Sequence, residues 1–169
     1  MKNLILYLFL LTNCISYSQE DSKIDLEQLE SKVFSLINDY RVSLQVTQLE
    51  KDIILQKAAK DHSIYIAKKQ SLTHEQSNPN KKLPKDRVYF YKGTDFILVG
   101  ENILYTSIKN KVYTNDDLDI LAVKIFDLWK NSPNHLKILS DSKFTFTELG
   151  FTLDSKNNRL YVAQVFGAK

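Results

Sequence analysis

Apolar residues recur at steps of three and four in three separate segments of this 169-residue chain. Such spacing places them on one face of an α-helix, so each segment predicts an amphipathic helix. The first helix is expected within Ile24 to Arg41, the second ends near Gln70, and the third is capped by Asp116 or Asp117. The apolar positions are Leu26, Leu29, Val33, Ile37 and Tyr40, then Leu55, Ala58, Ala59, His62 and Ile66, then Leu118, Leu121, Ala122, Ile125 and Trp129.

Two further regions have the composition of strands. Phe96 to Tyr105 is rich in β-branched and aromatic residues, and its Gly100 predicts a sharp local bend. Residues 148–154 and 159–166 predict a C-terminal hairpin joined by residues 155–158. Helices followed by a terminal hairpin are typical of an α+β domain.

The segments between these elements are predicted to be less regular. Residues 71–95 contain two prolines and a glycine and show no sustained period, which predicts a long surface loop. Ser132 followed by Pro133 is typical of a helix start, with the serine as cap, and predicts a short helix through Ile138.

The N-terminus has the pattern of a signal peptide. A basic residue precedes an apolar run that is too short to span a bilayer, and small residues at Ser16 and Ser18 predict cleavage after Ser18. Residues 19–169 would then form a single secreted or extracytoplasmic domain without cysteine. Two alternatives remain, a buried N-terminal helix and a lipid anchor at Cys14, although Asn13 stands where lipidation sites favour a small residue.

The charge of the chain is compatible with a small ligand but does not support nucleic-acid binding. The formal net charge is +3, and the basic residues are spread along the chain rather than gathered in one block. No apolar stretch predicts a transmembrane segment, and the pattern does not address the oligomeric state.

Several short motifs together resemble the bacterial branch of the CAP superfamily, also called the SCP domain. The motifs run from about Val33 to Gly167. In the first half of the chain they are Ile37 to Arg41, the second-helix residues Leu49, Asp52, Leu55, Ala59, His62 and Ser63, and the single residues His74 and Arg87. In the second half they are Gly100 to Ile103, the string Trp129, Ser132, Pro133 and His135, and Gly150 with Gln164 to Gly167. The resemblance implies a three-layer α-β-α sandwich with a small antiparallel sheet between helical layers.

The resemblance also implies a cleft lined by two histidines and two glutamates. His74, Glu101 and His135 match three of these positions, and Ser132 occupies the fourth, where many eukaryotic members have glutamate. Two imidazoles and a carboxylate are suitable ligands for Zn²⁺ and leave a position open for water. His74 and His135 are therefore the candidate metal ligands.

Each of these residues also has a purely structural interpretation. Glu101 can accept backbone N–H groups at the Gly100 bend, and Ser132 can act only as a helix cap. His62, on the apolar face of its helix, is expected to be a hydrogen-bonded core residue. Arg87 is by default a solvated loop charge.

Three functions are compatible with this pattern. The first is a non-enzymatic extracellular protein that binds a metal ion, a lipid, a peptide or another small molecule. The second is a metal-dependent hydrolase that uses His74, His135 and Glu101. The third is a cell-surface interaction module whose cleft is only structural. No serine lies in a nucleophile-elbow sequence, so the pattern favours binding over catalysis.

Overall fold

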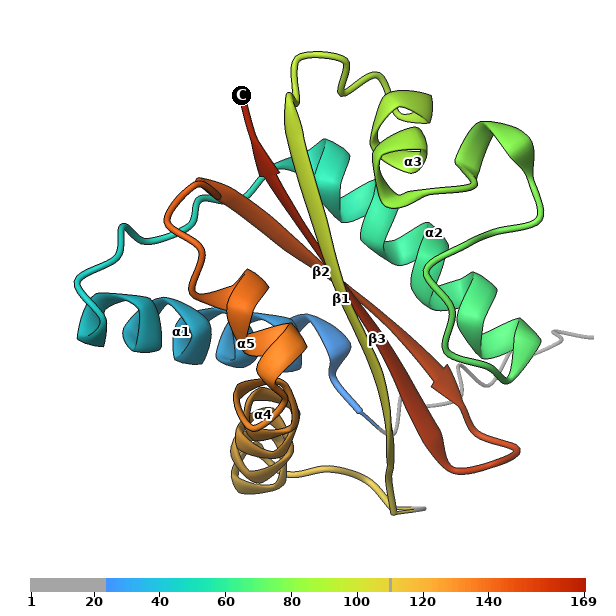
Figure 1. The fold of residues 1–169 in the computed structure, drawn as a ribbon. Coiled ribbons are helices and arrows are strands. Elements are labelled where there is room, and N and C mark those ends of the chain that lie inside the picture. Colours follow the sequence, from blue (N-terminus) through green and yellow to red (C-terminus); the bar gives the residue numbers. More distant parts are fainter. Residues whose placement is uncertain (1–23, 110) are drawn as a thin grey trace, which may run out of the picture.

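A small sheet lies between two layers of helices in the computed structural model, which describes residues 24–109 and 111–169 (Figure 1). Helices α1 (Leu26–Ser43), α4 (Asn115–Lys130) and α5 (Pro133–Leu139) cover one face of the sheet, and α2 (Ile53–Lys69) and α3 (Pro84–Phe90) cover the other. The expected three-layer α-β-α sandwich is confirmed. Ser18 and Cys14, where cleavage or lipidation is predicted, lie outside the described residues.

The sheet has three antiparallel strands in the order β1-β3-β2. Strand β1 spans Leu98–Ser107, β2 spans Phe146–Asp154 and β3 spans Arg159–Ala168. Glu101 pairs with Val165 and Asn102 with Gln164, which fixes the faces of β1, while β2 and β3 form the predicted hairpin. Strands β1 and β2 are therefore the two edges of the sheet.

Gly100 does not bend the chain as expected. Strand β1 is continuous through it, and a Cβ at this position would lie 2.7 Å from the ring of Phe144. The glycine is therefore required by the close approach of an aromatic side chain, and the prediction of a bend is wrong.

The largest core cluster lies between the sheet and the layer of α1, α4 and α5. Leu29, Val33 and Ile37 of α1 face Leu121, Ile125 and Trp129 of α4 in this cluster, as the helical spacing predicted. The cap of α4 differs from the prediction, because Thr114 caps the helix and Asp117 completes a reciprocal capping box with it. Asp117 is therefore the third residue of the helix and not its cap.

The guanidinium of Arg41 ties the end of α1 to the segment between α5 and β2. It is fully buried and donates hydrogen bonds to four carbonyl groups, those of Thr47, Leu139, Asp141 and Phe144. This contact holds the C-terminal end of α5 in place, and with it the position of His135 at the other end of that short helix.

The predicted surface loop at residues 71–95 contains two helical turns, so that expectation is wrong in part. A 3-10 helix at Pro79–Lys81 precedes α3. Pro84 occupies the first turn of α3, and the Asp86 carboxylate accepts the N–H of Leu83 at 2.9 Å. A helix of seven residues is too short to show a period in the sequence.

Candidate functional site

A buried carboxylate, Glu101 of β1, is the centre of the candidate site. Side chains alternate along a strand, so Glu101 points toward α2 and α3 while Asn102 points toward α5. Its side chain is 1% exposed, and its Oε2 accepts a 2.5 Å hydrogen bond from Nη2 of Arg87. Glu101 therefore does not fix a bend by accepting backbone N–H groups, but forms a buried ion pair with a side chain of α3.

Arg87 is fully buried, in contrast to the solvated charge that was expected. Besides Glu101, its guanidinium donates to the carbonyl groups of His74, Lys81 and Lys82 at 3.1–3.2 Å. The short helix α3 turns this side chain inward, which local sequence patterns do not reveal. Arg87 thus holds both the carboxylate and the backbone of His74.

His62 lies on the apolar face of α2 and is fully buried, as expected. Its Nε2 is 2.8 Å from the carbonyl oxygen of Thr73 and 3.4 Å from Oε1 of Glu101, and its Nδ1 is 3.2 Å from the amide nitrogen of Gln76. These neighbours assign the proton to Nε2, while Nδ1 accepts from Gln76. Burial lowers the pKa of His62 below its usual range, opposed by the charge of Glu101, and thereby favours the neutral ring.

The role of His62 in this site was missed by sequence reasoning, which treated it only as a core residue. Its helical position predicted burial, but the carboxylate that it contacts comes from a strand 39 positions later, as the residue numbers show. No local pattern carries that information.

His74 is the member of the site that reaches solvent. Its side chain is 52% exposed, and Nδ1 lies 2.8 Å from Oε1 of Glu101. A carboxylate oxygen can only accept, so Nδ1 of His74 carries the proton that it donates. In the neutral ring, Nε2 then keeps its lone pair, which is the arrangement that carboxylates impose on metal-binding histidines.

His135 belongs to α5, on the other face of the sheet. It is half-buried, and its carbonyl oxygen accepts a 3.2 Å hydrogen bond from the side-chain amide of Asn102, the residue next to Glu101. Its Nδ1 is buried with no hydrogen-bond partner among the described residues. Burial and, to a smaller extent, the charge of His74 lower the pKa of His135.

Ser132 occupies the cap position of α5, as expected, but its side chain makes no capping hydrogen bond. Its carbonyl oxygen accepts the N–H of Leu136 at 2.8 Å, and its backbone N–H donates to the carbonyl of Trp129 at 3.1 Å. Within the described part of the chain, no hydrogen bond of Ser132 involves Glu101, His74 or His135.

The residues at this site do not fit a three-ligand metal centre. Within residues 24–109 and 111–169, no group of three or more His, Cys, Asp and Glu side chains is placed to hold a metal ion. The physical reason is that Arg87 occupies one oxygen of Glu101 and two imidazoles surround the other. Neither His74 nor His135 therefore belongs to a group of three such side chains within the described residues.

A family model described as "CAP: Cysteine-rich secretory protein family" matches residues 34–166 of the chain. The chain belongs to the CAP family. No curated protein matches the sequence of this CAP domain. None of the helices in the described residues is long and apolar enough to cross a membrane.

Solved structures share the fold of this CAP domain. An outer surface protein from Borrelia burgdorferi is 23% identical, with a TM-score of 0.70 over 86% of this chain and 96% of that one. An extracellular SCP-domain protein from Bacillus anthracis is 24% identical, with a TM-score of 0.63 over 85% of this chain and 41% of that one. A cysteine-rich secretory protein from Staphylococcus aureus is 17% identical, with a TM-score of 0.54 over 85% of this chain and 39% of that one. This CAP domain thus spans about two fifths of the length of the last two proteins.

Proposed function

We propose that this CAP protein acts outside the cytoplasm as a non-catalytic binding protein, with His74 and His135 at its ligand site. The observation that carries the proposal is the environment of Glu101. Arg87 occupies one of its oxygens and His74 and His62 approach the other, so the carboxylate positions its neighbours and is not open to a substrate. The chemistry offered to a ligand is then that of two imidazoles.

The hydrogen bond between His74 and Glu101 defines the type of ligand group that fits. Because Nδ1 of His74 donates to the carboxylate, Nε2 of the neutral ring can only accept. A neutral His74 therefore favours a hydrogen-bond donor, such as a hydroxyl or ammonium group of a lipid, a peptide or another small molecule. A divalent metal ion such as Zn²⁺ can use the same lone pair, with water or the ligand completing its coordination.

The metal-dependent hydrolase has less support. It needs a third protein ligand, or a free general base beside the metal-bound water, and Glu101 is engaged in an ion pair instead. If the binding tests below fail, the protein is better explained as an interaction module whose cleft is purely structural.

Calorimetric titration of Zn²⁺ tests the two-imidazole site. We expect 1:1 binding to the wild type and a loss of about tenfold or more in affinity for His74→Ala and for His135→Ala. Glu101→Gln should weaken binding by about tenfold, because a neutral amide accepts the N–H of His74 more weakly than a carboxylate does. Glu75→Ala, which removes an exposed carboxylate beside His74, is the matched control and should bind like the wild type.

Native mass spectrometry of gently purified protein tests the organic ligand. A retained molecule that is lost in His74→Ala and His135→Ala but kept in Glu75→Ala would support the proposal. Equal, negligible Zn²⁺ binding in all variants, together with no retained molecule in the wild type, would overturn it.

A further inference from the structure

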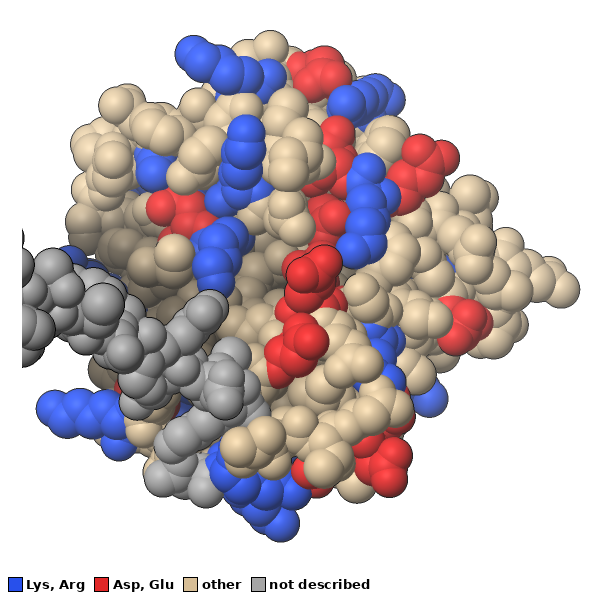
Figure 2. All heavy atoms as spheres, turned by 180° about the vertical axis from the view of Figure 1, so that it is seen from behind, with Lys and Arg blue, Asp and Glu red and all other residues tan. Residues whose placement is uncertain are grey.

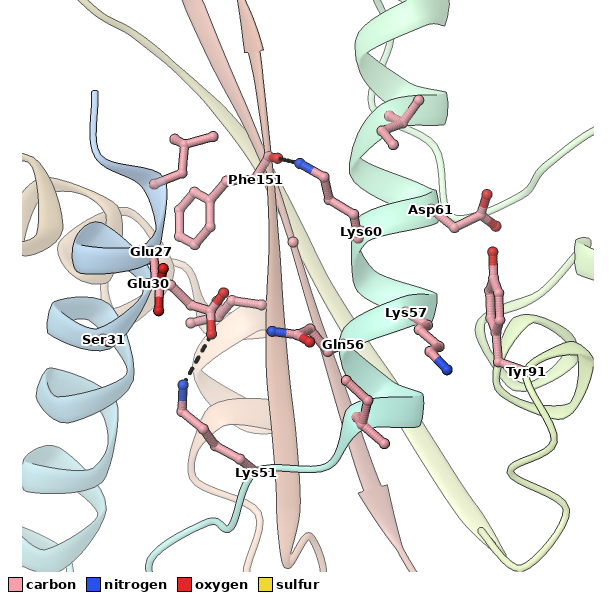
Figure 3. Close-up of a pocket in the computed structure, with 15 residues that line it drawn as sticks. Glu27, Glu30, Ser31, Lys51, Gln56, Lys57, Lys60, Asp61, Tyr91 and Phe151 are labelled. Carbon is pink, nitrogen blue, oxygen red and sulfur yellow. Dashed lines mark hydrogen bonds and ion pairs between the residues drawn. The ribbon is translucent and has the colours of Figure 1, made fainter. Parts of the chain in front are cut away.

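A groove lies between the two helical layers at the β2 edge of the sheet, the edge opposite the one formed by β1 (Figure 3). Its volume is about 750 Å³. Helix α1 forms one wall, α2 forms the other, and the floor is the segment Leu149 to Phe151 of β2. None of His74, Glu101 and His135 lines it, so it is separate from the site described above.

The outer edge of β2 already pairs with extended backbone at the end of this groove. Glu50 donates its N–H to the carbonyl of Thr145 at 2.8 Å and accepts the N–H of Thr147 at 2.9 Å, which forms a parallel bridge. The outer edge of β2 thus uses its backbone groups to pair with extended chain at this point. By the two-residue repeat of a strand, the backbone groups of Leu149 and Phe151 point outward in the same direction as those of Thr147.

Side chains bind the outward backbone groups where the groove opens. The N–H of Leu149 is 3.3 Å from Oε2 of Glu148, and the carbonyl of Phe151 accepts a hydrogen bond from Nζ of Lys60, which reaches down from α2 (Figure 3). Charged side chains on a strand edge protect it from indiscriminate pairing. They are also replaceable, because an incoming backbone can take over both hydrogen bonds and release the ammonium group of Lys60.

The two walls differ in net charge. On α1 the groove is lined by Glu27 and by Glu30, which pairs with Lys51 at 3.0 Å, and on α2 by Lys57, Lys60 and one acidic residue, Asp61. The side chains of an added strand point alternately toward the two faces of the sheet, and hence toward the two walls. An extended peptide with basic residues on one side and acidic residues on the other would therefore match both walls.

We propose that this groove docks an extended peptide segment of a partner protein, added as a strand to the outer edge of β2. Backbone hydrogen bonds to Leu149 and Phe151 would provide affinity, and alternating basic and acidic side chains would provide specificity. The proposal is independent of the function assigned to His74 and His135, because the two sites share no residue.

Amide chemical shifts of the ¹⁵N-labelled protein test the pairing. The probe is an end-capped octapeptide of alternating Lys and Glu, and its control has the same composition in two blocks. We expect the alternating peptide to shift the amides of Leu149, Gly150 and Phe151, and the block peptide to bind at least about threefold more weakly. Two further peptides are N-methylated, one at the odd-numbered backbone amides and the other at the even-numbered ones. Only one of these two sets of amides faces β2 in an added strand, so one peptide should lose binding and the other should keep it.

Charge-reversal variants test the walls. Glu27→Lys and Lys60→Glu should each lower the affinity for the alternating peptide by about threefold to tenfold. Glu75→Lys, which lies outside the groove, should leave this affinity unchanged. Equal binding of all four peptides, or no shift at the β2 edge at millimolar peptide, would overturn the proposal. Self-association of the protein that Lys60→Glu abolishes would show that the occupant of the groove is a second copy of the chain. Larger shifts of the same amides with palmitate than with the peptide would show that the occupant is a fatty acid.

Discussion

At the scale of single residues, Glu101 connects three parts of the chain that lie far apart in sequence. Arg87 of α3, His62 of α2 and His74 of the intervening segment all contact its carboxylate. Removing one partner of a buried ion pair costs about 3–5 kcal/mol, because the remaining charge stays desolvated. The same residues that orient His74 therefore also hold α3 against the sheet.

A second buried carboxyl group, Glu148, lies at the β2 edge and has a different environment. Burial, together with the nearby Glu30, raises its pKa to about 7, although Lys51 at 3.9 Å favours the charged form. The folded protein thus binds a proton at Glu148 more tightly than the unfolded chain does. Its stability should fall as pH rises from about 4.5 to about 7 and show no further loss from this group above that range.

Glu148→Gln tests this pH dependence. At pH 8 the variant should be more stable than the wild type by roughly 3 kcal/mol, because an amide carries no charge to desolvate. At a pH of about 4.5 the difference should largely disappear, since the native carboxyl is then protonated. Urea unfolding at the two pH values measures both, with Glu75→Gln as an exposed control. A difference that is the same at both values would contradict the assignment.

At the scale of elements, helix α2 packs directly on β2 at Gly150. A Cβ at this position would lie 2.3 Å from the backbone of Ala59, whereas at Gly100 the nearest atom belongs to the ring of Phe144 at 2.7 Å. Side chains can rotate away from a new methyl group, but the backbone of a helix can move only as a whole.

Gly150→Ala is therefore expected to destabilise the protein more than Gly100→Ala. Overpacking in a core costs about 1–3 kcal/mol, and we expect Gly150→Ala to lie at or above the upper end of this range. Equilibrium denaturation compares the two variants directly. Equal destabilisation would show that α2 shifts as easily as a phenyl ring.

At the scale of the whole molecule, packing and buried polar contacts hold the layers together. The only cysteine in the sequence is Cys14, so no intrachain disulfide can form. Arg41 ties α1 to the α5–β2 segment, and Arg87 ties α3 to β1. On the face seen in Figure 2, basic and acidic side chains are interspersed, which fits the small net charge of +3.

Processing of the N-terminus is testable on the intact protein. We expect the protein recovered from the medium to have the mass of residues 19–169, because the pattern around Ser18 predicts cleavage there. Cys14→Ser should leave the amount released unchanged. Recovery in the membrane fraction, with a lipid-modified N-terminus at Cys14, would show that the chain is anchored instead.

Helices α1, α2 and α4 and the C-terminal hairpin are predictable from local sequence patterns. Each of these is long enough for its apolar residues to repeat on one face, so burial of that face leaves a periodic signal. His62 and Trp129 were assigned to the core for the same reason. The family resemblance added Glu101, His74 and His135, whose separation in the chain hides any spacing.

The surroundings of Glu101 depend instead on how distant parts of the chain pack together. Arg87 has the polarity of a surface residue, yet α3 turns it inward, where three carbonyl groups accept from its Nη1 and the carboxylate accepts from its Nη2. Likewise, the charged groove at the β2 edge arises from residues of α1, α2 and β2 that no local pattern connects. Periodicity reports which side of an element is buried, whereas the partner that it meets depends on how the layers are stacked.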